Sequence, residues 1–186
     1  MSLKTDYSLS ELAKLNIHFI GIGGSGMSGI ARIMLAKGFT VSGSDKNDSA
    51  MLTSLKALGA KVEVGHKQEN LGAADLVIIS AAIDENNPEL ALARKKMIPV
   101  AARAQALAWL MSESTSIAVA GTHGKTTTTA MLAVALQTAG ADPSFAVGGT
   151  INTAGTNAHS GSGSIFIAEA DAVSYTHLTL PTNREV

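Results

Sequence analysis

The sequence contains no cysteine, and this absence removes several classes of protein at once. Without cysteine there is no disulfide scaffold, no thiolate metal site and no cysteine nucleophile. A cysteine-free chain fits a reducing compartment.

Long apolar runs are absent as well. No run reaches the roughly 18–20 residues needed to cross a bilayer. The N-terminal stretch MSLKTDYSLSELAKL is polar and carries both charge signs, unlike a signal peptide. We therefore expect a cytoplasmic protein without membrane insertion.

The chain also lacks a basic block. Its formal net charge is −1, with charges spread along the sequence, so nucleic-acid binding has no electrostatic footprint. Hydrophobic residues make up 46% of the 186 residues, which is enough for a packed core. This length suits one ordinary domain, or one domain and part of another, and nothing in it predicts an oligomeric state.

Short apolar runs alternate with longer amphipathic stretches, the pattern of an α/β fold around a parallel sheet. The predicted strands are 16–20, 39–41, 61–64, 76–79, 117–120, 144–147 and 165–168. The predicted helices are 27–37, 50–58, 89–96, 101–111 and 125–138. Residues 150–164 are polar and glycine-rich and are predicted to form a loop, and the SESTS stretch at 112–116 predicts a domain boundary.

The first glycine-rich loop, GIGGSGMSG, spans residues 21–29. Gly21, Gly23 and Gly26 satisfy G-x-G-x-x-G between a predicted strand and a predicted helix, which is the context that a nucleotide-binding loop requires. Such a helix offers unpaired N–H groups and partial positive charge to a pyrophosphate. Asp45 follows the second strand, where a ribose-binding acid is expected. A turn needed only for packing, and an NAD-dependent oxidoreductase, remain alternatives.

A second loop, GTHGKTT, spans residues 121–127 and also lies between a predicted strand and a predicted helix. It departs from the usual phosphate loop because Val119 stands where that pattern has glycine. Lys125 can reach the terminal phosphates of ATP, and Thr126 or Thr127 can offer a hydroxyl to Mg²⁺. The alternative is a threonine-capped helix with one solvated lysine.

Several stretches together resemble the Mur ligase family, from about residue 16 to residue 171. The most specific are IHFIGIGGSGMSGIA (17–31) and AVAGTHGKTTTT (118–129), and the others include VSGSD (41–45) and AEAD (168–171). The resemblance implies a Rossmann-like domain over 1–112, which holds the UDP part of a nucleotide sugar. It also implies the first part of a P-loop-type ATPase domain over 113–171.

The implied activity is ATP-dependent joining of L-alanine to the lactyl carboxylate of UDP-N-acetylmuramate through an acyl phosphate, a step of peptidoglycan precursor synthesis. Three alternatives stay open. One is a recycling ligase that joins a whole peptide to UDP-N-acetylmuramate. The others are the oxidoreductase and a non-catalytic module that binds nucleotide sugars.

The resemblance also assigns candidate site residues. Contacts to the diphosphate fall to Gly23, Gly24, Ser25, Gly26 and Met27. The surroundings of the nucleotide sugar fall to Asp45, His66, Ser80 and Arg103. ATP binding falls to Gly121, Thr122, His123, Gly124, Lys125, Thr126 and Thr127, with Lys125 as the catalytic cation. Mg²⁺ falls to Thr126 and Glu169.

Two other histidines are predicted to stay outside the chemistry. His18 lies in a strand pattern and is expected to be structural, and His159 lies in the predicted loop and is expected to face solvent. After Asp171 the chain reads AVSYTHLTLPTNREV and departs from the family's pattern. We expect residues 172–186 to be non-native and this chain alone to be unable to complete ligation.

Overall fold

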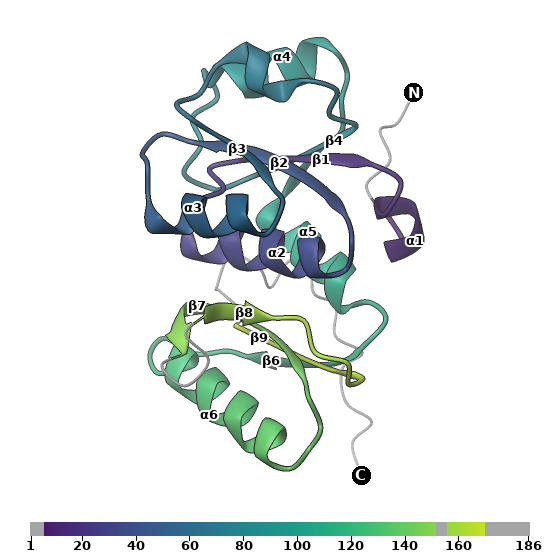
Figure 1. Ribbon diagram of the computed structural model, residues 1–186, viewed down its shortest axis with the longest axis vertical. Helices are drawn as coiled ribbons and strands as arrows, with labels where there is room; N and C mark the ends of the chain where they lie inside the picture. The colour runs from purple at the N-terminus through teal and green to yellow at the C-terminus, as the bar shows by residue number, and fades with distance from the viewer. Residues whose placement is uncertain (1–5, 152–155, 170–186) are drawn as a thin grey trace.

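Two β-sheets, one after the other along the chain, organise the fold (Figure 1). The computed structural model describes residues 6–151 and 156–169. The first sheet is parallel, with strand order β3-β2-β1-β4-β5. Its strands are β1 (Asn16–Ile20), β2 (Thr40–Asp45), β3 (Lys61–Val64), β4 (Leu76–Ile79) and β5 (Val100–Ala102).

The second sheet has strand order β6-β9-β7-β8. Its strands are β6 (Thr115–Val119), β7 (Ser144–Ile151), β8 (Thr156–His159) and β9 (Ile165–Glu169). Strand β9 runs parallel to both β6 and β7, whereas β8 is antiparallel to β7. Because Glu169 is in register with Val119, the end of β9 lies beside the end of β6.

Helices separate and cover the two sheets in layers (Figure 1). Helix α4 (Pro88–Lys95) covers the outer face of the first sheet. The inner face of the first sheet, which is turned toward the second sheet, carries α2 (Ser25–Ala36), α3 (Ala50–Ala57) and α5 (Arg103–Met111). The second sheet contacts α2 through β7 and β8, and its far face carries α6 (Lys125–Thr138). The remaining helices are α1 (Leu9–Leu12) and the 3₁₀ helix η1 (Gln68–Leu71).

The core between the two sheets is continuous. Met27 and Ile30 of α2 and Trp109 of α5 belong to one buried cluster with Ala158 of β8 and Phe166 of β9. We call the first sheet with α1 to α5 the first unit, and the second sheet with α6 the second unit. Burial of the apolar side chains between them favours a fixed arrangement of the two units. Separate clusters fill the space beneath α4 and beneath α6.

Local sequence explains where helix α4 begins and ends. Asn87 caps it, because its side-chain oxygen accepts hydrogen bonds from the backbone N–H groups of Glu89 and Leu90 at 2.9 and 3.2 Å. Pro88 occupies the first turn, where its missing N–H costs nothing. Arg94 and Lys95 lie in the last turn, where positive charge complements the helix dipole.

The predicted α/β class with a parallel sheet is confirmed. Three local predictions are wrong. The predicted strand 39–41 is β2, which continues to Asp45. Residues 150–164 are not only loop, because β8 lies within them and pairs with β7. The predicted helix 101–111 begins only at Arg103, because Val100–Ala102 pairs with β4 as a strand. Among the described helices, none combines the length and hydrophobicity needed to span a bilayer.

Candidate functional site

A cleft of about 380 Å³ lies where the first glycine loop meets the second sheet. The first unit contributes the start of α2, Ser80 after β4, and Arg103 with Leu107 of α5. The second unit contributes Ala146, Val147, Gly148 and Glu169, from β7 and the end of β9. The cleft is therefore built by both units.

The first glycine loop is fastened to strand β2. The N–H groups of Gly21 and Ile22 donate to the carbonyl of Ser44 at 2.9 and 3.0 Å. The N–H of Gly23 donates to Oδ2 of Asp45 at 2.8 Å. A Cβ on Gly23 would lie 2.9 Å from that same oxygen, so only glycine fits beside Asp45 without displacement. Asp45 thus supports the loop from behind.

Helix α2 begins immediately after this loop. Its N-cap is Gly24, which has no side chain to accept hydrogen bonds from the first turn. The N–H groups of that turn therefore remain available, together with the positive end of the helix dipole, for an anion. Arg103 adds a positive charge here, because its Nη1 would lie 2.9 Å from a Cβ placed on Gly26.

The second glycine loop leads from β6 into α6. Gly124 is the N-cap of α6 and has φ of +78°, a left-handed conformation that favours glycine. Nζ of Lys125 donates to the carbonyl of Gly121 at 2.8 Å, so the cation folds over its own loop. Except for Lys125, residues 121–127 are exposed, and none of them lines the cleft.

Glu169 connects the cleft to the second loop. Its place at the end of β9 puts it at the edge of the sheet from which β6 enters that loop. Oε1 of Glu169 is buried and accepts no hydrogen bond within the described residues. A Cβ on Gly148 would come within 2.9 Å of Oε2, so this glycine leaves space beside the carboxylate. A buried, unpaired carboxylate oxygen is costly unless a ligand completes it.

The unpaired Oε1 of Glu169 has the chemistry of a ligand for a magnesium ion that arrives with a nucleotide. The described part of the chain has no group of three or more acidic or histidine side chains that could hold a metal by itself. Mg²⁺ usually keeps several waters and binds one or two protein carboxylates together with phosphate oxygens. The unpaired oxygen of Glu169 suits this donor set, and Thr126 lies exposed in the first turn of α6.

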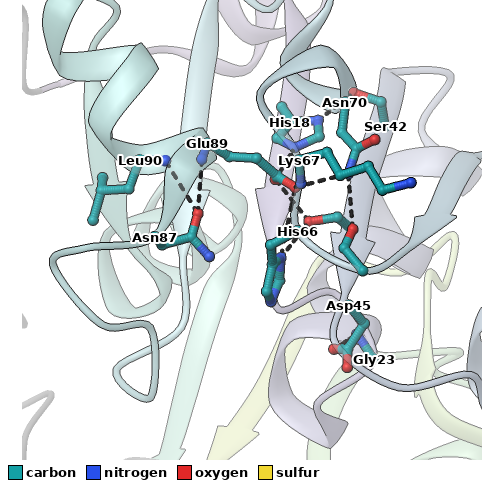
Figure 2. A network of polar contacts seen from close by, with 12 residues as sticks. His18, Gly23, Ser42, Asp45, His66, Lys67, Asn70, Asn87, Glu89 and Leu90 are labelled. Atoms are coloured by element: carbon teal, nitrogen blue, oxygen red, sulfur yellow. Dashed lines mark hydrogen bonds and ion pairs between the residues drawn. The ribbon is translucent and has the colours of Figure 1, made fainter.

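A buried polar network lies under the first sheet's outer layer, centred on Glu89 (Figure 2). Oε2 of Glu89 accepts from His18 Nε2 at 2.9 Å and from Ser44 Oγ at 2.7 Å. Oε1 accepts from Asn70 Nδ2 at 2.8 Å and from the backbone N–H of Lys67 at 3.0 Å. Burial acts to raise the pKa of Glu89, but the hydrogen bonds from His18, Ser44 and Asn70 outweigh it and lower the pKa.

Hydrogen-bond directions in this network fix the histidine tautomers. Glu89 can only accept, so Nε2 of His18 carries a proton, and in the neutral ring Nδ1 accepts from Ser42 Oγ at 2.9 Å. Ser44 uses its only hydroxyl proton on Glu89. Nδ1 of His66 must therefore donate to Ser44 Oγ, at 2.9 Å, which leaves Nε2 of a neutral His66 as an acceptor.

The structure separates the predicted site residues into groups. Those that line the cleft are Gly24, Ser25, Gly26, Met27, Ser80, Arg103 and Glu169. Gly23, Asp45 and His66 instead support the loop or join the buried network. Asp171 lies outside the described residues, as does the tail 172–186 that was predicted to be non-native.

The predictions for His18 and His159 have different outcomes. His18 is structural as predicted, fully buried on Glu89. His159 is not in a loop as predicted, because it ends β8, where its Nε2 lies 2.8 Å from Asp142 Oδ1. Its side chain is 39% exposed, in agreement with the predicted solvent exposure. Hydrogen bonds from Ser162 and His159 lower the pKa of Asp142 to about 2.

Sequence reasoning missed three residues that the geometry singles out. Glu89 follows a proline at a helix start, and this resembles an ordinary first-turn acid. Gly148 lies in the short VGG stretch at 147–149, which resembles the family but was given no role in the site. Asn157 lies in the stretch predicted as loop, where no periodic pattern distinguishes a buried asparagine. Their roles follow only from tertiary contacts.

The structure thus has two glycine-rich loops, each leading from a strand into a helix. Arg103 lies against the first loop, and Glu169 ends the strand beside the one that leads into the second. The family model described as "Mur ligase family, catalytic domain" matches residues 16–115. The chain belongs to the Mur ligase family.

Similar proteins carry a more specific name. The UDP-N-acetylmuramate–L-alanine ligase of Renibacterium salmoninarum is 61% identical over 163 residues, covering 88% of this chain and 35% of the relative. That of Acidothermus cellulolyticus is 50% identical over 190 residues, covering 99% of this chain and 40% of the relative. The chain thus spans 35–40% of the length of these two curated relatives.

Solved structures give the same family. UDP-N-acetylmuramate-alanine ligase MurC from Thermotoga maritima has a TM-score of 0.75 and 33% identity, over 83% of this chain and 37% of that one. The UDP-N-acetylmuramate:L-alanyl-gamma-D-glutamyl-meso-diaminopimelate ligase from Neisseria meningitides has a TM-score of 0.79 and 34% identity, over 84% of this chain and 52% of that one. Ligases with different amino substrates thus share this part of the fold.

Proposed function

We propose that the chain is the nucleotide-sugar-binding and ATP-loop part of an ATP-dependent ligase that joins L-alanine to UDP-N-acetylmuramate in peptidoglycan precursor synthesis. The observation that carries the proposal is the shared cleft. There the first glycine loop and Arg103 of one unit face the Glu169 edge of the other. A cytoplasmic location belongs to the same proposal.

The first loop and Arg103 are proposed to hold the diphosphate of UDP-N-acetylmuramate. Free N–H groups at Ser25, Gly26 and Met27, the helix dipole and the guanidinium all favour an anion at this point. The rest of the acceptor can then extend along the cleft toward Gly148 and Glu169. This arrangement is what carries an acceptor carboxylate toward the second unit.

The second loop is proposed to hold ATP as the phosphoryl donor, with Gly121–Gly124 supplying backbone N–H groups. Lys125, which already lies over the loop, can turn to the terminal phosphates and neutralise their charge. Glu169 and Thr126 are proposed to hold Mg²⁺, which would stabilise charge on the transferred phosphoryl group. Phosphoryl transfer from ATP to the lactyl carboxylate gives ADP and an acyl phosphate. The amine of L-alanine then attacks the acyl carbon, and the tetrahedral intermediate loses a proton and expels phosphate to leave the amide.

A second candidate function is that of a peptide-recycling ligase, because the chain is also similar to the Neisseria peptide ligase structure. The curated relatives that are 61% and 50% identical carry the name of the alanine-adding enzyme, and this favours that reaction. The solved structures do not discriminate, since the alanine ligase is 33% identical and the peptide ligase 34%. The cleft binds the acceptor, which both reactions share, so it does not discriminate between them.

Equilibrium binding tests the proposal. The purified chain should bind UDP-N-acetylmuramate and should not bind NADH. Arg103→Ala should weaken UDP-N-acetylmuramate binding about tenfold, because a charge-assisted hydrogen bond is worth about 1.5–3 kcal/mol. Arg94→Ala is the matched control, since Arg94 is exposed and pairs with Glu85 on the outer layer, away from the cleft. Binding of NADH without UDP-N-acetylmuramate would instead support the oxidoreductase.

A further inference from the structure

A buried asparagine of the second unit contacts the helix start that is proposed to form the diphosphate site. Asn157 of β8 is 2% exposed, and its Nδ2 donates to the carbonyl oxygen of Ser25 at 2.6 Å. The same nitrogen donates to Ser28 Oγ at 3.1 Å. Ser28 Oγ in turn donates to the Ser25 carbonyl at 3.0 Å. Both amide protons are therefore used on the first turn of α2.

The orientation of this amide is determined by chemistry. A carbonyl oxygen only accepts, so the nitrogen and not the oxygen of Asn157 must face Ser25. Oδ1 of Asn157 is buried and accepts no hydrogen bond within the described residues. A side chain chosen only for stability would not leave a buried acceptor unpaired, which is costly.

The hydrogen bond acts on the group that faces the cleft. The carbonyl of Ser25 and the N–H of Gly26 belong to one planar trans peptide unit, so they point in opposite directions. By holding the carbonyl, Asn157 also fixes the direction of the Gly26 N–H. Gly26 lines the cleft, and its N–H is one of the unpaired donors of the first turn.

Small residues permit this close approach. A Cβ on Gly29 would lie 3.4 Å from the Cβ of Ala158 and 3.5 Å from Nδ2 of Asn157. Ala158 belongs to the same buried cluster as Met27 and Ile30 of α2. Strand β8 is thus packed directly on the helix whose N-terminus forms the site.

We infer that Asn157 is a positioning residue for the diphosphate site, through which the ATP-binding unit aligns the UDP-sugar loop of the other unit. This inference rests on the proposed function. It assigns to the β7–β8 hairpin a role in binding the acceptor, at a distance from the loop that is proposed to hold ATP.

The test measures two affinities in the same protein. Asn157→Leu removes the donor at similar size, and Asn157→Asp keeps the shape but presents an acceptor to the Ser25 carbonyl. Each variant should bind UDP-N-acetylmuramate about tenfold more weakly, with ATP affinity unchanged. Asn86→Leu is the matched control, since Asn86 is exposed and lies outside the cleft.

Ser28→Ala keeps the experiment decisive if an Asn157 variant fails to fold. It removes one acceptor of Asn157 and should weaken UDP-N-acetylmuramate binding by about two- to threefold without changing ATP affinity. Unchanged UDP-N-acetylmuramate affinity in the folded variants would overturn the inference. Parallel loss of both affinities together with the thermal midpoint would also overturn it, because that is the result of a purely structural role. A parent chain that does not bind UDP-N-acetylmuramate would instead contradict the proposed function.

Discussion

At the scale of single residues, two glutamates with the same charge differ in burial and in the number of hydrogen bonds that they accept. Glu89 and Glu85 are four positions apart, yet the first is fully buried with four hydrogen bonds and the second is exposed beside Arg94. The buried carboxylate joins polar groups of β1, β2 and the η1 segment behind the first glycine loop. Ser44 links the two, since its carbonyl accepts from that loop and its hydroxyl donates to Glu89.

Removing the buried carboxylate should therefore be severe. Glu89→Ala leaves His18, Ser44 and Asn70 without their acceptor and should lower the free energy of unfolding by about 3–5 kcal/mol in urea titrations. Glu85→Ala is the control and should cost less than about 1 kcal/mol, because exposed ion pairs contribute little. Similar losses in the two variants would show that the network contributes no special stability.

The ionisation of Glu89 should make the free energy of unfolding depend on pH in the acid range. Because the folded pKa of Glu89 lies below its ordinary value of 4.5, its ionisation stabilises the fold above that pH. The contribution is lost as the pH falls through the lowered pKa. The difference in unfolding free energy between the parent and Glu89→Ala should thus be constant from pH 5 to 7 and shrink below pH 4.5.

At the scale of elements, the second glycine loop depends on one left-handed residue at the start of α6. Gly124 has φ of +78°, and Gly140, after the end of the same helix, has φ of +80°. Neither would have a neighbour within 4 Å of an added Cβ, so alanine is opposed at both positions by backbone conformation alone. The two glycines therefore form a matched pair.

Gly124→Ala and Gly140→Ala should each lower stability by about 1–2 kcal/mol. Only Gly124→Ala should also weaken ATP binding, because it shifts the backbone that leads into Lys125 and Thr126. Thermal unfolding and ATP titration of both variants provide the check. Equal ATP affinity in the two would argue against a nucleotide at this loop.

Elements also show how far sequence reasoning reaches. Strands β1, β3 and β4 and helix α6 agree with the predicted ranges, because their apolar patterns and flanking glycines are local signals. Strand β2 was predicted to end at Val41, but its continuation SGSD pairs with β1 through Ser44 and with β3 through Asp45. Strand β8, TNAH, has a partner in β7 but no local pattern of its own. The end of β2 and the whole of β8 were missed because pairing with neighbouring strands, and not the propensity of their own residues, determines their structure.

Sequence predicted the residues that line the cleft but not the residues that support them. Gly24 to Met27, Ser80, Arg103 and Glu169 were identified from motifs and resemblance, and they meet in one cleft. The supports behind them, Glu89 and Asn157, were not. Each lies far in sequence from the group that it holds, so only the fold reveals the contact.

At the scale of the whole molecule, the two units share one core and one cleft, and the cleft is lined by the first glycine loop but not by the second. This division of labour is the central claim: the first loop holds the diphosphate of the acceptor, and the second holds the triphosphate of the donor. A dehydrogenase needs only the first of these. The second loop and the unpaired Glu169 oxygen are what an ATP-dependent ligase requires in addition.

The most direct test is a calorimetric titration of the chain with UDP-N-acetylmuramate, performed once without nucleotide and once with saturating ATP and Mg²⁺. Two separate loops predict one UDP-N-acetylmuramate bound per chain in both titrations, with ATP unable to displace it. Displacement of UDP-N-acetylmuramate by ATP in proportion to the ATP concentration would mean a single shared site, and would contradict the account.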